Sequence, residues 1–303
     1  MRVVVAATAD VAIPTAEWLR NSEHDLVRIV TTPDSKSGRG KMLKASPMSI
    51  WADENKIAIL KPGTSIEISQ AVEDCDVVIA IAYGKILTSE TLLIPRFGFL
   101  NLHFSLLPAF RGAAPVQRAI LNGEKVTGFT IFKIDQSLDT GPIYVQEKYE
   151  IDARANSADV LKDLSKLGAK AFSKVLIDVE NGVQPQNQNA VGISFAPKVS
   201  KDEARINWRT SSTDLLNLVR AFTPVPSAWT TFDGAHLKIT EIRPASIQVH
   251  LEPGVIHIEN RRLFVGTSDQ PIEISRVVPS GKKEMNTLDW LNGAPVASGE
   301  VFE

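Results

Sequence analysis

Phe99-Leu-Asn-Leu-His-Phe-Ser-Leu-Leu-Pro-Ala-Phe-Arg-Gly-Ala-Ala-Pro115 is the stretch around which the rest of the chain is organised. Its first five residues read as a strand, in which Asn101 and His103 are two residues apart. On an extended chain this spacing places both side chains on one face, while Leu100 and Leu102 face a core. A carboxamide and an imidazole therefore stand together. The pair fits either a reactive site or a strand end with two satisfied polar residues.

Short apolar runs alternate with helical patterns in the first half of the chain. Residues 2–6, 26–30 and 77–82 are rich in Val, Ile and Ala, which is typical of buried parallel strands. Residues 14–21 and 46–54 have the pattern of helices, each with a proline near its first turn. The alternation predicts an α/β fold with a doubly wound, mainly parallel sheet. Ligands of such sheets bind beyond the carboxyl ends of the strands.

Two further features belong near predicted strand ends. Tyr83-Gly84 closes the apolar run over 77–82, so it is expected at the same edge of the sheet as the Asn-x-His pair. Asp139 belongs to the loop Asp135-Gln-Ser-Leu-Asp-Thr-Gly-Pro142, which two strand-like segments flank. An Asp in this context is usually a turn former, so the residue alone leaves both a catalytic role and a turn role open.

The second half of the chain has a long helix, a polar stretch and then a region of short strands. An amphipathic helix is predicted over 157–179, capped by Ser157, and the polar run Gln184-Pro-Gln-Asn-Gln-Asn189 follows it. Short strand-like runs at regular spacing predict a small β-barrel: 229–232, 237–242, 254–258, 262–265 and 272–278. We therefore expect a catalytic domain over 1–183, a linker over 184–207 and a β-barrel domain over 208–303.

Composition narrows the class of protein. With 303 residues, 44% hydrophobic and 22% charged, the sequence has the profile of a soluble globular protein. A single cysteine, Cys75, excludes an intramolecular disulfide and a cysteine-rich zinc site, and the five histidines show no zinc-ligand spacing on a helix. No apolar run reaches the roughly 20 residues of a membrane span, and the first residues lack a signal-peptide pattern. We expect a cytoplasmic protein without a metal site. No Gly-x-Gly-x-x-Gly follows the first strand, which argues against a dinucleotide site.

One basic stretch could contact nucleic acid. Within residues 32–47 a single acid, Asp34, accompanies four basic residues, which are Lys36, Arg39, Lys41 and Lys44. Such a flexible basic loop suits phosphate and base-edge contacts, although composition alone favours a solvated loop. Residues 200–303 hold eleven Lys and Arg against thirteen Asp and Glu. Contact of that region with nucleic acid would therefore depend on local clusters of charge.

Several short motifs agree in order and spacing with one family. Asn101-Leu-His103, Ser105-Leu-Leu-Pro108, Arg111-Gly-Ala-Ala-Pro115 and Leu138-Asp-Thr-Gly141 resemble the motifs of the folate-dependent formyltransferases. The resemblance covers nearly the whole chain, and within that family it is to the branch that formylates methionyl-tRNA. It implies an enzyme that transfers a formyl group from 10-formyltetrahydrofolate to the amine of methionine on initiator tRNA. It implies no metal and no obligate protein partner, and it makes the β-barrel one of the oligonucleotide-binding type.

The same resemblance assigns roles to residues. Formyl transfer needs a donor aimed at the developing oxyanion and a proton carrier near neutral pH. Asn101 and His103 are expected to polarise the formyl oxygen, and Asp139 to orient His103, favour its charged form and help relay the proton. The folate slot is expected to involve Tyr83, Gly84, Ser105, Leu106, Leu107 and Pro108. Phe104, where the family often has a small residue, would narrow this slot or point into the core. The Gly-Arg-Gly-Lys core of the basic stretch resembles the loop that contacts tRNA, which implicates Lys36, Arg39, Lys41 and Lys44.

Two alternatives accompany this interpretation. One is another formyltransferase of the superfamily, acting on a small amine such as a nucleotide sugar or glycinamide ribonucleotide. The basic stretch and the second domain disfavour the glycinamide enzyme, which needs neither. The other is a non-catalytic tRNA-binding homologue, which the intact Asn101, His103 and Asp139 disfavour.

Overall fold

The chain divides into two compact units in the computed structural model, which describes residues 1–37, 42–247 and 249–303. The first unit comprises residues 1–115, 126–150 and 161–197, and the second comprises 116–125, 151–160 and 198–303. Residues 184–197, which the sequence assigned to a linker, belong to the first unit here. The domain limits 1–183, 184–207 and 208–303 stay a prediction.

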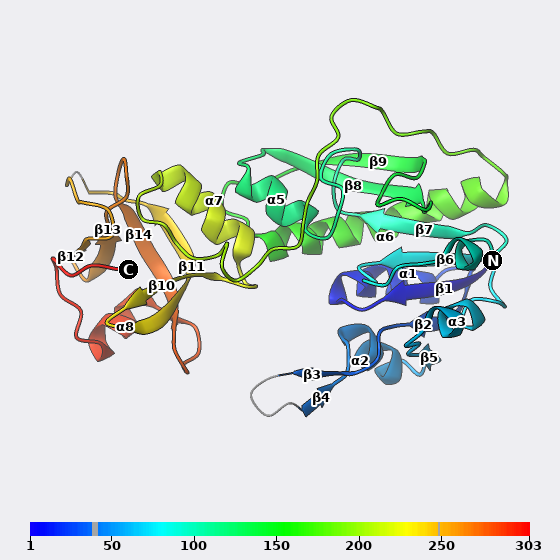
Figure 1. Ribbon diagram of the computed structural model, residues 1–303, viewed down its shortest axis with the longest axis horizontal. Coiled ribbons are helices and arrows are strands. Elements are labelled where there is room, and N and C mark those ends of the chain that lie inside the picture. Colours follow the sequence, from blue (N-terminus) through cyan, green and yellow to red (C-terminus); the bar gives the residue numbers. More distant parts are fainter. Residues whose placement is uncertain (38–41, 248) are drawn as a thin grey trace. The chain divides into compact units, whose positions relative to one another are not determined.

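Among the described residues, seven strands form the sheet of the first unit in the order β5-β2-β1-β6-β7-β8-β9 (Figure 1). The parallel part contains β1 (Arg2–Ala7), β2 (Asp25–Val30), β5 (Ile59–Leu60), β6 (Val77–Ile81) and β7 (Phe99–His103). The antiparallel part adds β8 (Val126–Lys133) and β9 (Ile143–Glu150). Strand order reverses between β1 and β6, which is where doubly wound sheets bind ligands. The predicted α/β sheet is confirmed, with two antiparallel strands at one edge.

The helices begin where the sequence supplies caps. The helices that follow the N-terminal strands are α1 (Ile13–Arg20), α2 (Pro47–Glu54), α3 (Ser65–Gln70) and α4 (Ser89–Leu92), and α5 (Pro115–Leu121) and α6 (Ser157–Glu180) come later. Ser46 Oγ accepts from the amide of Ser49, which caps α2. The predicted cap of α6 was wrong by one residue. Asn156 Oδ1 accepts from the amides of Ala158 and Asp159, because the capping side chain belongs to the residue before the helix.

A glycine lets α6 approach β7 closely. A Cβ atom on Gly168 would lie 2.5 Å from Leu102 Cδ1, a separation that packed carbon atoms do not reach. Leu102 therefore points toward α6, and its neighbours Asn101 and His103 point to the opposite face of the sheet. This arrangement is the one that their alternation along the chain predicts.

The basic stretch contains two short strands that the sequence did not reveal. β3 (Ser35–Ser37) and β4 (Met42–Lys44) pair in antiparallel fashion, with the backbone of Lys36 opposite Leu43 and that of Ser35 opposite Lys44. Strand propensity is weak in a run of Ser and Lys, so the pattern looks like a loop. Two of the predicted tRNA contacts, Arg39 and Lys41, lie outside the described residues.

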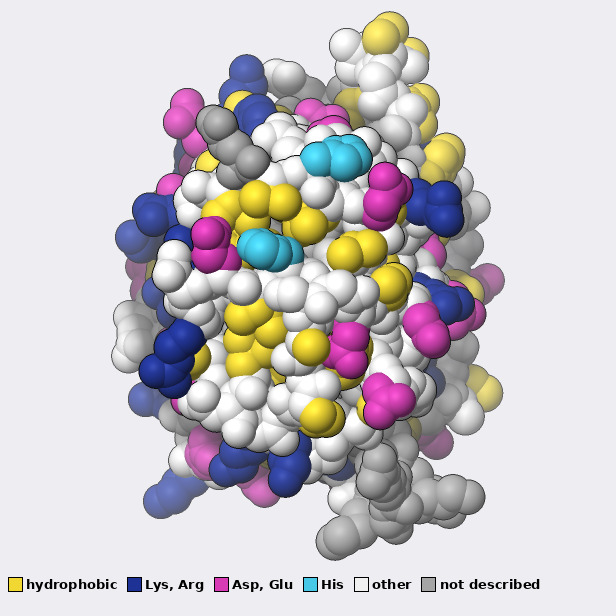
Figure 2. Space-filling model, turned by 90° about the vertical axis from the view of Figure 1, so that its left-hand side faces the viewer, with side chains coloured by type: hydrophobic (Ala, Val, Ile, Leu, Met, Phe, Trp, Pro, Cys, Tyr) yellow, Lys and Arg dark blue, Asp and Glu magenta, His cyan; other side chains and the backbone are white. Residues whose placement is uncertain are grey.

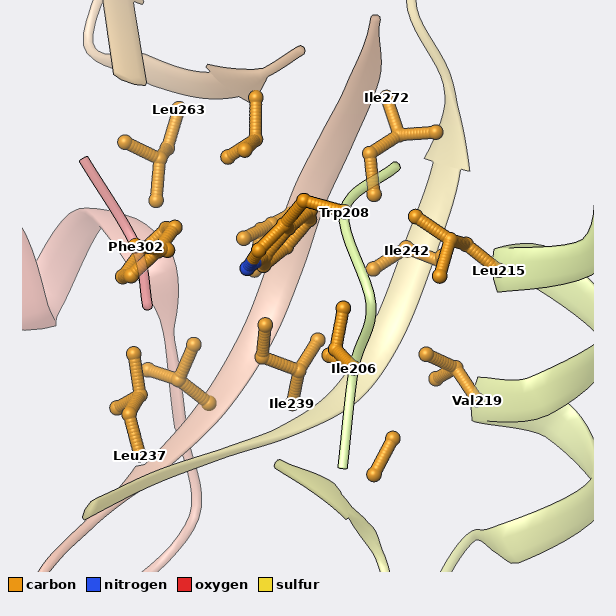
Figure 3. Close-up of a cluster of buried hydrophobic side chains, with 14 of the residues drawn as sticks. Ile206, Trp208, Leu215, Val219, Leu237, Ile239, Ile242, Leu263, Ile272 and Phe302 are labelled. Atoms are coloured by element: carbon orange, nitrogen blue, oxygen red, sulfur yellow. The ribbon is translucent and has the colours of Figure 1, made fainter. Parts of the chain in front are cut away.

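The second unit is built on an antiparallel sheet. Its strands are β10 (Ala228–Phe232), β11 (Ala235–Pro244), β14 (Ile272–Pro279), β13 (Arg262–Val265) and β12 (Ile256–Glu259), in that spatial order, and β15 (Met285–Asn286) pairs with β14. The helices α7 (Ser212–Phe222) and α8 (Thr287–Gly293) accompany this sheet. Figure 3 shows the core between α7 and the strands, where Trp208 and Phe302 stack with centroids 5.4 Å apart. The predicted strands are found within two residues of their expected limits, so the predicted C-terminal domain built on short antiparallel strands is confirmed.

Candidate active site

A pocket of about 560 Å³ opens beyond the carboxyl ends of β6 and β7. The turn over 82–87 supplies one wall, and residues 101–104 at the end of β7 supply a second. The loop over 134–139 supplies a third, with Gly112 and Ala113 beside it. The volume falls within the ~300–1,000 Å³ that small-molecule sites occupy. The pocket lies at the edge of the sheet where the strand order predicts a ligand crevice.

His103 is buried at the base of this pocket, with 6% of its side chain exposed. Its Nε2 lies 2.9 Å from the carbonyl oxygen of Phe110. A carbonyl only accepts, so this contact assigns the hydrogen of the neutral ring to Nε2. Nδ1 is then the nitrogen that can accept a proton. Asn101, half-buried two residues earlier, lines the same pocket.

Asp139 reaches the same place from the loop between β8 and β9. Its Oδ2 lies 3.7 Å from Nδ1 of His103 and accepts a hydrogen bond of 2.8 Å from the amide of Gly112. The first distance is too long for a hydrogen bond but short enough for a direct charge interaction. Asp139 has a φ of 53°, in the left-handed region that Asp tolerates better than most residues. The structure therefore brings together the three side chains that the sequence singled out.

Burial and charge act in opposite directions on His103. Removal of the ring from water lowers the pKa of His103 from its ordinary value, and this is the largest influence. The carboxylate of Asp139 and the hydrogen bond to Phe110 both raise that pKa, by smaller amounts. The sequence predicted that Asp139 favours the charged imidazole. Its carboxylate does act in that direction, but burial outweighs it and the resting ring is neutral at pH 7.

Tyr83 and Gly84, which were expected from the sequence in the folate slot, line the pocket. The hydroxyl of Tyr83 is buried and has no hydrogen-bond partner among the described residues. Burial raises the pKa of Tyr83 to about 12, so the hydroxyl keeps its hydrogen and can donate. A buried donor without a partner is costly. Phe104 lines the pocket while only 7% exposed, so it forms both wall and core.

The predicted folate residues Ser105, Leu106, Leu107 and Pro108 form a turn behind this wall and are not among the residues that line the pocket. Ser105 Oγ donates to the carbonyl of Ala109 at 2.6 Å. The amide of Leu107 donates to Thr130 Oγ1, and its carbonyl accepts from Gln146 Nε2. These polar groups are therefore engaged inside the fold. In this structure the turn fixes the shape of the wall.

Sequence reasoning missed the backbone groups that hold the pair of His103 and Asp139. The carbonyl of Phe110 accepts from Nε2 of His103, and the amide of Gly112 donates to Oδ2 of Asp139. A Cβ atom on Gly112 would lie 2.6 Å from the carbonyl oxygen of Ala196, and Gly112 has a φ of 127°, so only glycine fits. The glycine after Arg111 was the available signal, since it marks a close approach of backbone.

The described residues form neither a cluster of metal ligands nor a membrane-spanning helix. Within residues 1–37, 42–247 and 249–303, no three His, Cys, Asp or Glu side chains come together in a way that could hold a metal ion. In those ranges no helix is long and apolar enough to cross a membrane.

Comparison with known proteins places the chain in a family. The formyl transferase family model matches residues 1–176, and the model of the formyl transferase C-terminal domain matches residues 198–295. The chain is 41% identical to the methionyl-tRNA formyltransferase of Thermobifida fusca over 100% of its own length and 99% of that protein. It is 39% identical to that of Salinispora arenicola over the full length of both. The chain belongs to the methionyl-tRNA formyltransferase family.

Solved structures support the formyltransferase fold. The crystal structure of HypX from Aquifex aeolicus in complex with tetrahydrofolic acid superposes with a TM-score of 0.71. The two sequences are 16% identical, and the match covers 100% of this chain and 50% of that longer one. At this identity the likeness extends to the fold. Like its relatives among the methionyl-tRNA formyltransferases, the chain is a one-carbon transferase.

Proposed function

We propose that this enzyme transfers a formyl group from 10-formyltetrahydrofolate to the amine of methionine on initiator tRNA. The observation that carries the proposal is the meeting of Asn101, His103 and Asp139 at one pocket. The full-length identity to methionyl-tRNA formyltransferases supports the choice of acceptor over a small amine. The proposed place of action is the cytoplasm, where charged initiator tRNA is used.

The pocket fits a folate. Its walls combine apolar side chains with a few polar ones, among them Asn101, His103 and Asp139, and sites for flat heterocycles need this combination of apolar surface and few polar groups. Tyr83 and Gly84 are proposed to contact the donor directly. The turn over residues 105–108 is proposed to act by holding the wall in place. When bound, the donor supplies the formyl group, whose oxygen gains negative charge as the amine attacks.

His103 is proposed to carry the proton. The neutral ring already uses its Nε2 hydrogen on the carbonyl of Phe110, so Nδ1 can accept the proton that the attacking amine loses. The resulting imidazolium faces the carboxylate of Asp139, which stabilises its charge. The same proton can then be returned to the leaving nitrogen. This order makes His103 a base first and an acid second.

Asn101 is proposed to stabilise the oxyanion. Its carboxamide lines the pocket beside His103 and makes no hydrogen bond to another described residue. An amide N–H can therefore donate to the formyl oxygen as charge develops there. Removing one such donor costs about 10²–10³ in turnover in comparable sites.

Recognition of tRNA is proposed to use the basic stretch, with Lys36, Arg39, Lys41 and Lys44. Lys44 is exposed, as contact with a phosphate requires. The second unit is proposed to make weaker, local contacts. Figure 2, the face at the left of Figure 1, shows acidic and basic side chains interspersed. Arg262 pairs with Glu273 and Arg276 pairs with Glu284, so part of the positive charge of this unit is already neutralised.

The deciding experiment offers the enzyme formylated folate with three acceptors. These are charged initiator tRNA, charged elongator methionyl-tRNA and a nucleotide-linked amino sugar. Rapid formylation of the initiator tRNA and none of the sugar is expected. Formylation of the sugar at a comparable kcat/KM would overturn the proposed acceptor, and binding of tRNA without turnover would overturn the catalytic assignment.

A further inference from the structure

Gln188 lies in the polar run after α6, and its side chain joins the two loops that hold His103 and Asp139. Its Nε2 donates to the carbonyl of Asp139 at 2.8 Å and to the carbonyl of Gly141 at 2.9 Å. Its Oε1 accepts from Nη2 of Arg111 at 2.6 Å. One carboxamide therefore joins the loop of Asp139 to Arg111, the residue that follows Phe110.

The orientation of this carboxamide is fixed by its partners. If the amide were turned over, its oxygen would face the two carbonyls of residues 139 and 141, and its NH2 group would face a guanidinium. Both contacts would then join like groups. In the observed orientation both amide hydrogens and the oxygen are used. The contact with Arg111 is charge-assisted, which makes it the stronger kind of hydrogen bond.

The segment that carries Gln188 is itself anchored to the first unit on both sides. Before it, Gln186 exchanges backbone hydrogen bonds of 2.7 and 2.9 Å with Ile143 at the start of β9. After it, Ser194 Oγ accepts from the amide of Phe110, and the amide of Ala196 donates to the carbonyl of Arg111 at 2.7 Å. The position of Gln188 is therefore determined by the same scaffold that shapes the pocket.

We propose that Gln188 is a positioning residue, which holds the backbone of Asp139 so that its carboxylate faces Nδ1 of His103. This inference rests on the proposed function, because it assumes that His103 and Asp139 take part in formyl transfer. Asp139 has a left-handed backbone, and this conformation sets the directions of its carbonyl and its carboxylate together. Gln188 donates hydrogen bonds to the carbonyls of Asp139 and Gly141. The carboxylate is oriented as a result, and its Oδ2 accepts from the amide of Gly112.

The test uses the full-length enzyme with substitutions that separate the contacts. Gln188→Met keeps the length of the side chain and removes both kinds of hydrogen bond. Gln188→Glu keeps an acceptor for Arg111 but cannot donate to the carbonyls of residues 139 and 141. We expect both variants to lower kcat about tenfold, since small displacements of reacting groups cost this much or more, with KM for both substrates within about twofold. Gln186→Met is the matched control, because Gln186 is exposed and uses its backbone alone.

A double-variant cycle separates positioning from a general structural role. If Gln188 acts through Asp139, Gln188→Met should lower kcat by less than about twofold in an enzyme that already carries Asp139→Asn. Full additivity would overturn the proposal. A parental kcat in Gln188→Glu would also overturn the proposal, because the loss of rate in Gln188→Met would then come from the lost contact with Arg111 alone. Thermal unfolding of each variant shows whether the loss of rate reflects unfolding.

A second readout needs no substrate. Among the described residues, Asp139 is the charged side chain that shifts the pKa of His103. In NMR titrations of histidine-labelled enzyme, Gln188→Met and Asp139→Asn should both move the His103 pKa downward, and Gln186→Met should not. An unmoved His103 pKa in Gln188→Met overturns the positioning role. If the His103 pKa shifts as expected but His103→Ala still formylates normally, the proposed function fails while the structural inference stands.

Discussion

Oδ2 of Asp139 stands 3.7 Å from Nδ1 of His103 and instead accepts a hydrogen bond of 2.8 Å from the amide of Gly112. In the neutral ring Nδ1 carries a lone pair, so a closer carboxylate would be repelled. Once Nδ1 is protonated, the same carboxylate becomes its natural partner. The separation of Oδ2 and Nδ1 therefore suits a site in which His103 is neutral at rest and its imidazolium is stabilised once it has accepted a proton.

Replacement of either residue of the Asn-x-His pair tests the chemistry directly. Asn101→Ala and His103→Ala should each lower kcat by roughly a hundredfold or more, because one loses the oxyanion donor and the other the proton carrier. Steady-state formylation assays with saturating substrates measure this. Circular dichroism should show a retained fold, since neither residue is a large apolar core group. Near-normal turnover in folded variants would remove these residues from the mechanism.

Asp139→Asn tests the charge without changing the shape. The carboxylate raises the pKa of His103 against the effect of burial, so its removal should lower that pKa further. The acid limb of the kcat profile should then move to lower pH, and the maximum rate should fall, because the imidazolium loses its stabilising partner. Rates measured from pH 5 to pH 9 check both. An unchanged profile and rate would leave Asp139 with the role of a turn residue alone.

The fold could be predicted from the sequence because its buried strands are runs of apolar residues. The runs at 2–6 and 77–82 became β1 and β6, and the short strands of the second unit appeared within two residues of their predicted limits. Periodicity reports burial, and burial dominates these elements. The hairpin of β3 and β4 escaped prediction because its strands have three residues each and four of the six are Ser or Lys, so the pattern resembles that of a loop.

The candidate site could be predicted from the sequence only in part. Asn101, His103 and Asp139 carry reactive groups, and their motifs marked them. The carbonyl of Phe110 and the amide of Gly112 are backbone groups that every residue has, so no side-chain pattern could identify them. Gln188 lies 49 residues from Asp139 in a run that composition marks as a linker. Its contact depends on long-range packing, which the sequence does not display.

The basic stretch yields a prediction about acceptor choice. Arg39→Ala should weaken use of charged initiator tRNA by about 1–3 kcal/mol if Arg39 makes a base-edge contact. Lys44→Ala should have a smaller effect and should reduce the salt dependence of kcat/KM, as loss of one phosphate contact does. Folate binding, measured separately by fluorescence, should be unchanged in both. Equal losses on initiator and elongator tRNA would indicate phosphate contact only, and no loss on either would make this stretch a solvated surface.

Stability should depend on pH through His103. Burial lowers its pKa in the folded enzyme, so the unfolded chain binds its proton more readily. Stability is then greatest above the unfolded pKa of about 6.5 and decreases as the pH falls through the lower folded pKa. His24 and His236, whose pKa values burial also lowers, act in the same direction. The contribution of His103 is isolated by comparing the midpoint of thermal unfolding at pH 7.5 and pH 5.5 in the parent and in His103→Gln. The variant should lose less stability than the parent on acidification. An equal loss would contradict the conclusion that burial lowers the pKa of His103.

Gly141→Ala should disturb the site without touching a reactive group. A Cβ atom at this position would lie 1.7 Å from the carbonyl oxygen of Lys133, which is backbone and cannot move aside as a flexible side chain would. The loop over 135–142 would have to lift away from the end of β8, and Asp139 would move with it. We expect kcat to fall at least tenfold and the unfolding temperature to drop, because displaced active-site groups and lost backbone packing act together. Gly63→Ala in the same unit is the control, since its Cβ would meet only Glu67 Oε2, at an ordinary 3.6 Å. Parental activity in Gly141→Ala would show that the loop can shift without displacing Asp139, and would contradict the tight coupling between this turn and the histidine.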